Sequence, residues 1–79
     1  MNNRSEIEHE LIQVLSLVLG HPVPPTITRA SEPAWDSLKH MQIVFAVEER
    51  FDRQFTEREI PELDSLSRFA DLLEKPHAP

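Results

Sequence analysis

The chain has 79 residues, a length that fits one small domain over residues 1–79. Its 8 basic and 14 acidic side chains are spread over both halves and give a net charge of −6. Nucleic-acid binding needs lysine and arginine to neutralise phosphates, so this balance argues against a nucleic-acid partner. Cysteine is absent, which excludes disulfides, thiolate metal sites and cysteine nucleophiles.

The sequence indicates neither a signal peptide nor a membrane span. Its first six residues are mostly polar and lead directly into a polar helix start. The longest apolar runs hold four or five residues, such as residues 43–47, whereas a membrane span needs about 20. We therefore expect a cytoplasmic monomer without a membrane partner. An acidic surface favours partners with basic docking faces, but the charge alone is better explained by the solubility of a small domain.

The first helix is predicted over residues 6–19. Ser5 and Glu8 have the spacing of a capping box, in which each side chain pairs with the backbone of the other. Apolar side chains then recur at helical spacing, at Ile7, Leu11, Val14, Leu15 and Val18. Gly20 and Pro22 end this helix.

A proline-rich loop is predicted over residues 21–35, which hold four of the seven prolines of the chain. Proline lacks the amide proton that a helix interior needs. Loops longer than about 12–15 residues are uncommon in compact domains and usually have a function. We expect Ile27 and Trp35 to pin this loop onto the rest of the fold.

Three further helices are predicted after the loop. The second runs from Ser37 or Leu38 to Phe51. The third is short, because Thr56 and Glu59 form a second capping box and Pro61 stops the helix within about one turn.

The fourth helix starts at Asp64 or Ser65 and has one apolar face, formed by Leu66, Phe69, Ala70 and Leu73. No segment shows strand alternation. The sequence thus predicts an all-α fold, a small four-helix bundle ordered over residues 5–74, with a frayed tail at 75–79.

The predicted second helix has more apolar surface than an ordinary surface helix, which needs a stripe of about 100°. One edge of its apolar arc carries Leu38, Met41 and Phe45, next to the acids Glu48 and Glu49. An apolar strip rimmed by acids suits transient docking. Burial in the core is the alternative for the three apolar side chains.

Asp36 and Ser37 form the predicted start of this helix. Asp36 is a good N-cap residue, which would leave the Ser37 hydroxyl free in the first turn. A phosphate on that hydroxyl would lie near unpaired amides at the positive end of the helix dipole. However, residues 64–66 repeat the tripeptide Asp-Ser-Leu, and simple capping is the alternative explanation for both copies.

Residues 35–51, Trp-Asp-Ser-Leu-Lys-His-Met-Gln-Ile-Val-Phe-Ala-Val-Glu-Glu-Arg-Phe, resemble the second helix of acyl carrier proteins. In that family a Gly-x-Asp-Ser-Leu motif opens the helix and an acid pair before a phenylalanine closes it. The resemblance extends over residues 6–74 in the order and spacing of the predicted elements. It implies an acyl-carrier-like four-helix bundle that is not itself an enzyme.

The resemblance also implies a cofactor, 4′-phosphopantetheine, which a magnesium-dependent phosphopantetheinyl transferase moves from coenzyme A to a serine. Ser37 matches that serine, and Asp36 matches the acid before it. Acyl intermediates of a fatty-acid, polyketide or related pathway would form thioesters on the arm. Acyl-loading and acyl-processing enzymes would dock on Leu38, Met41, Phe45, Glu48 and Glu49. Acyl chains would enter the bundle among Val44, Val47, Leu63 and Phe69.

The sequence departs from the family pattern near the serine. Ala34 stands in place of the usual glycine, and Lys39 and His40 follow the serine where acids are common. The Trp-Asp-Ser-Leu form is more similar to discrete carriers of polyketide or nonribosomal peptide assembly. Two alternatives therefore stay open: a peptidyl or aminoacyl carrier with the same arm, and a small helical adaptor without a prosthetic group.

The remaining titratable residues do not predict a catalytic or metal site. No two of the four histidines have the spacing of a shared metal site on a helix. We expect each to lie on the surface or in a loop: His9, His21, His40 and His77.

Overall fold

The computed structural model describes residues 3–75 of the chain. These residues form three α-helices and one short 3-10 helix: α1 (Arg4–Leu19), α2 (Ser37–Phe51), η1 (Ile60–Glu62) and α3 (Leu66–Glu74). They contain no strand, only one isolated bridge between Thr28 and Ser65. The predicted all-α class is confirmed. Within the same residues no helix is long and apolar enough to cross a membrane.

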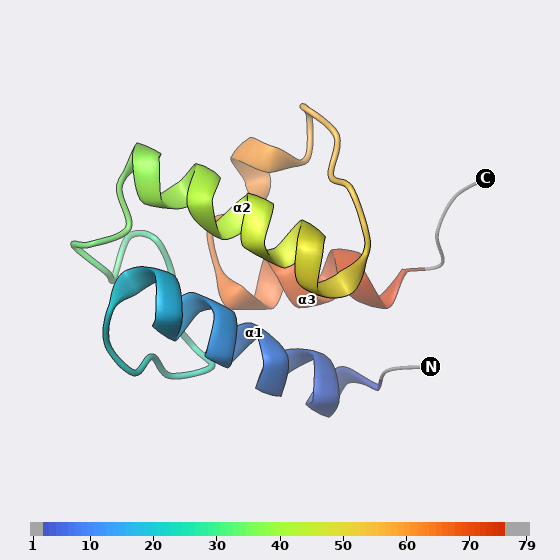
Figure 1. Ribbon diagram of the computed structural model, residues 1–79, viewed down its shortest axis with the longest axis horizontal. Helices are drawn as coiled ribbons and strands as arrows, with labels where there is room; N and C mark the ends of the chain where they lie inside the picture. The colour runs from blue at the N-terminus through green and yellow to red at the C-terminus, as the bar shows by residue number, and fades with distance from the viewer. Residues whose placement is uncertain (1–2, 76–79) are drawn as a thin grey trace.

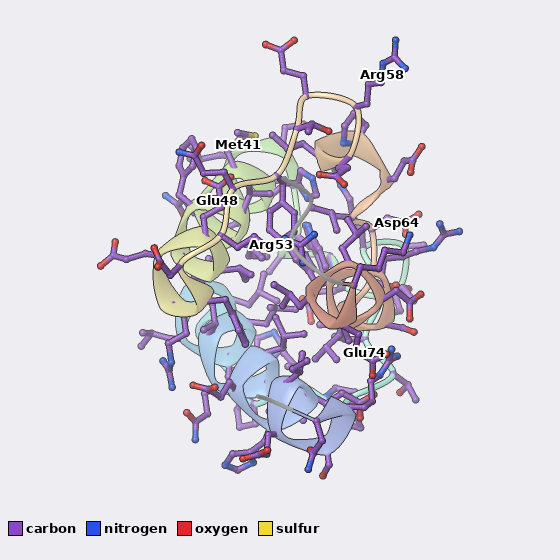
Figure 2. The ribbon with its side chains drawn as sticks, turned by 90° about the vertical axis from the view of Figure 1, so that its right-hand side faces the viewer. Met41, Glu48, Arg53, Arg58, Asp64 and Glu74 are labelled. Carbon is purple, nitrogen blue, oxygen red and sulfur yellow. The ribbon has the colours of Figure 1, made fainter. Side chains whose placement is uncertain are left out.

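The helix α1 packs against both α2 and α3 (Figure 1). Figure 2 looks along the bundle and shows the three helices arranged around a shared apolar interior. The buried apolar side chains come from all three helices and from the segments between them: Ile7, Leu11, Val14, Leu15, Leu19, Val23, Ile27, Trp35, Ile43, Val44, Val47, Phe55, Leu63, Leu66, Phe69 and Ala70.

The start of α1 differs from the prediction. The capping box is formed by Asn3 and Glu6, not by Ser5 and Glu8: the Glu6 amide donates to the Asn3 side chain at 2.9 Å. Asparagine caps as well as serine, and the earlier start frees Glu8 to pair with Arg4 at 2.7 Å. Arg4 also reaches Asp71 of α3 at 2.7 Å. These two carboxylates, Asp71 first, raise the pKa of Arg4.

The predicted four-helix bundle is not confirmed, because the third helix is missing as an α-helix. The capping box itself is present, with the Thr56 amide donating to the Glu59 carboxylate at 2.9 Å and the return bond at 3.2 Å. It opens a turn that continues as η1. Pro61 lies at the start of η1, where its missing N–H is tolerated, so it does not act as the predicted stop.

The proline-rich loop is pinned to the bundle at two places, as predicted. Ile27 and Trp35 are both only 3% exposed. The segment around Ile27 also pairs with the start of α3: the Leu66 amide donates to the Ile27 carbonyl at 3.2 Å, and the Arg29 amide donates to the Asp64 carbonyl at 2.7 Å. The loop therefore has a fixed course between α1 and α2.

An ion pair links the two ends of the same loop. The imidazole Nε2 of His21 lies 3.1 Å from the Glu32 carboxylate. The Pro22 carbonyl, and then Glu32, raise the pKa of His21 above its ordinary 6.5, and the Ala34 amide, and then His21, lower that of Glu32 below its ordinary 4.5. The contribution of His21 to stability is complete below pH 6.5 and is lost as the pH rises through its raised pKa, whereas that of Glu32 is lost as the pH falls through its lowered pKa.

The side chain of His40 joins three segments in the interior. The indole Nε1–H of Trp35 donates to His40 Nδ1 at 3.0 Å, and His40 Nε2 lies 2.8 Å from the Ile60 carbonyl oxygen. An indole N–H only donates and a carbonyl only accepts, so this imidazole is neutral and carries its proton on Nε2. The expectation of a surface position was wrong, because His40 is 5% exposed.

Replacing His40 tests this junction. The His40→Leu substitution removes the partners of the buried indole N–H of Trp35 and of the part-buried Ile60 carbonyl. We expect the free energy of unfolding to fall by about 2–4 kcal/mol, since each buried group left unpaired costs about 1–3 kcal/mol. Urea unfolding followed by circular dichroism measures this loss. The control His9→Leu, at an exposed position, should change stability by no more than about 0.5 kcal/mol. Equal urea midpoints for the two variants would contradict a stabilising role for the hydrogen bonds of His40.

Candidate functional site

The candidate site lies at the start of α2, where Asp36 is the N-cap. Its carboxylate accepts a hydrogen bond from the Lys39 amide at 2.9 Å, and its carbonyl accepts one from the His40 amide at 2.8 Å. Its backbone is extended, with φ −94° and ψ −173°. The predicted cap and the predicted helix bounds are thus confirmed. Ser37 becomes the first helical residue.

The Ser37 hydroxyl is exposed and has a cationic neighbour. A guanidinium N–H of Arg29, in the proline-rich loop, donates to Ser37 Oγ at 3.2 Å. Among the described residues no carboxylate or imidazole is hydrogen-bonded to this hydroxyl. Unpaired amides of the first helical turn add positive potential beside it. The surroundings of Ser37 Oγ are therefore favourable to an anionic group.

The two Asp-Ser-Leu tripeptides adopt different registers at their helices. In the second copy the serine itself is the N-cap: Ser65 Oγ accepts from the Arg68 amide at 3.1 Å. In the first copy the aspartate takes that role, which leaves the Ser37 hydroxyl out of the cap. The leucines differ as well, since Leu66 is fully buried and Leu38 is 68% exposed. Of these two serines, only Ser37 therefore has a hydroxyl that does not cap a helix.

The apolar side chains predicted to dock partners lie on the surface to different degrees. Leu38 and Phe45 are 68% and 60% exposed, although both are large and apolar. Met41 is half-buried, and Figure 2 shows it at the outer side of α2, away from α1. Both interpretations of the apolar arc of α2 therefore apply in part: most of the arc is buried in the core, and one edge is exposed.

The acid pair predicted to rim this edge divides into two roles. The Glu48 carboxylate accepts a hydrogen bond from the Phe55 amide at 2.8 Å and is half-buried. It fastens the segment after α2 to the helix. Glu49 is exposed. Of the two acids, Glu49 is therefore the more accessible to a partner.

The four side chains predicted to line an acyl path belong to one core. All four are fully buried: Val44, Val47, Leu63 and Phe69. Phe55 packs edge-on against Phe69, with ring centroids 5.7 Å apart. In this conformation an acyl chain would have to displace packed side chains to enter among them.

Sequence reasoning missed two contributors to the site. Arg29 lies in a loop without periodicity, eight residues before Ser37, and no local pattern indicates their contact. His40 had a usable signal, because it falls on the apolar arc of α2, where a polar side chain needs a buried partner. Over residues 3–75 no group of three His, Asp or Glu side chains is placed to hold a metal ion.

Comparison with known proteins does not assign the site. No protein-family model matches the chain, and no curated protein is significantly similar to it. The interpretation of the site therefore rests on its geometry and on the resemblance of residues 35–51 to carrier helices.

Proposed function

We propose that the chain is an acyl carrier protein that holds acyl intermediates as thioesters on a 4′-phosphopantetheine arm attached to Ser37. The observation that carries this proposal is the exposed Ser37 hydroxyl at the first residue of α2, excluded from capping by Asp36 and placed beside Arg29. The resemblance to the acyl carrier family supports the same serine.

The modification requires a partner enzyme, a phosphopantetheinyl transferase with its magnesium ion. Ser37 Oγ forms a bond to the pantetheine-side phosphorus of coenzyme A, and the P–O bond to the adenosine bisphosphate breaks. The hydroxyl proton passes to a base on the transferase. When bound, the arm supplies a thiol for thioester formation. The chain contributes a fixed and accessible serine and a cationic neighbour for the phosphate.

The exposed edge of α2 is the docking surface in this proposal. Leu38, Met41 and Phe45 supply apolar contact, and Glu49 supplies charge beside them. The net charge of −6 favours enzymes with a basic face around the same contact. Acyl-loading and acyl-processing enzymes of a fatty-acid, polyketide or related pathway fit this description.

Two other functions would use the same surface. A peptidyl or aminoacyl carrier has the same arm, and the acid loaded on the arm distinguishes it. A helical adaptor would bind a partner through Leu38 and Phe45 and would carry no arm. The exposed Ser37 hydroxyl, which does not cap the helix and lies beside Arg29, favours a carrier, because an adaptor needs no attachment site.

The two serines of the repeated tripeptide provide an internal control for the attachment site. After incubation with coenzyme A and a transferase, we expect Ser65→Ala to gain one arm and Ser37→Ala to gain none, as measured by intact mass. Ser65→Ala should also lose about 0.5–2 kcal/mol of stability, because it removes a helix cap. An arm on Ser37→Ala, or its loss only from Ser65→Ala, would overturn the site.

Charge reversal at Glu49 tests the docking surface. Reversing Glu48 as well, as the sequence alone would suggest, would break its bond to the Phe55 amide. We expect Glu49→Lys to lower kcat/KM for modification by the transferase about 1.4- to fivefold, since an exposed charge pair contributes about 0.2–1 kcal/mol. The loss should shrink with added salt.

The matched control for Glu49→Lys is Glu57→Lys, the same charge change at an exposed residue of the turn between α2 and η1. We expect this control to keep nearly the wild-type kcat/KM. Equal losses in both variants would show that only net charge matters and would remove Glu49 from the docking surface.

A further inference from the structure

Arg29 differs from the other arginines that make contacts across the fold. Arg4 is paired with Asp71 and Glu8, and Arg50 is paired with Glu10. By contrast, the side chain of Arg29 is in hydrogen-bond contact with a neutral hydroxyl, that of Ser37. In the described part of the chain no carboxylate neutralises its charge.

Arg53 uses its charge in yet another way. Its guanidinium donates to the carbonyl oxygens of Leu72 and Lys75, at the end of α3. Figure 2 shows Arg53 between the chain after α2 and that helix. Arg53 therefore stabilises the fold, whereas Arg29 contacts Ser37, the side chain of the candidate site.

The backbone of Arg29 is held in place independently of this contact. Its amide donates to the Asp64 carbonyl at 2.7 Å, and the preceding residue, Thr28, forms a bridge with Ser65. Thr28 and Ser31 also close a tight turn, with the Ser31 amide donating to Thr28 Oγ1 at 3.0 Å. The second Asp-Ser-Leu copy thus anchors the segment that brings Arg29 to the first copy. A side chain on an anchored segment loses less freedom when it binds a ligand.

We propose that Arg29 is a positioning residue that pairs with the phosphodiester on Ser37 and fixes the root of the arm against the loop. This inference rests on the proposed function. The guanidinium of Arg29 already donates to Ser37 Oγ, the atom to which the phosphorus would be bonded. The free oxygens of that phosphate would lie two bonds from Oγ, close to the same guanidinium. Guanidinium and phosphate match in geometry and form short, charge-assisted hydrogen bonds. Modification of Ser37 therefore gives Arg29 an anionic partner, which none of residues 3–75 supplies in the unmodified chain.

The test uses phosphorus NMR of the protein after the transferase has added the arm. We compare the wild type with Arg29→Gln, Arg29→Lys and the control Arg68→Gln, which removes an exposed arginine at the start of α3. The chemical shift of the phosphodiester in the wild type should differ from that in the unfolded protein. This difference should be lost in Arg29→Gln, kept in part in Arg29→Lys, and unchanged in Arg68→Gln.

Added salt provides a second measurement that needs no variant. In the wild type it should move the phosphodiester signal toward its unfolded value, because salt screens an exposed ion pair. An arm on the wild type with the same signal in Arg29→Gln would overturn the role of Arg29 and leave the carrier function standing. No arm on the wild type would overturn both.

Discussion

The neutral imidazole of His40 is the contact on which the arrangement of the site depends. It accepts from the Trp35 indole and donates to the Ile60 carbonyl, so the end of the loop, α2 and η1 meet at one buried point. With Trp35 fixed, the next residue, Asp36, falls at the helix cap, and Ser37 follows it at the surface. The burial of Trp35 and His40 thus fixes the segment on which the exposed Ser37 lies.

The two Asp-Ser-Leu copies show why a short motif does not by itself define a site. Their registers differ by one residue: Ser65 caps α3 and precedes the buried Leu66, whereas Asp36 caps α2 and Leu38 lies at the surface. The copies are also connected, since residues 27–29 pair with residues 64–66. One copy is part of the support that places Arg29 beside the other.

The predicted parts of the fold are those encoded by local spacing. The ends of α2, the C-terminal end of α1, the cap at Asp36 and the burial of Trp35 follow from periodicity, capping preferences and proline chemistry. Local rules failed where two segments compete or where the partner is distant in sequence. Asn3 caps α1 in place of the predicted Ser5, and the next residue, Arg4, pairs with the distant Asp71 of α3. The bonds of Glu48 to Phe55, and of Arg29 to Ser37, join loops whose course no local pattern specifies.

The absence of cysteine allows a direct measurement of the central claim. Any thiol that stays with the unfolded, desalted protein after incubation with coenzyme A, magnesium and a transferase must belong to a covalently attached arm. Titration with a thiol reagent should find about one thiol per wild-type chain when modification is complete. No thiol in the protein, while the same transferase modifies a known carrier in a parallel reaction, would contradict the assignment of this chain as a carrier.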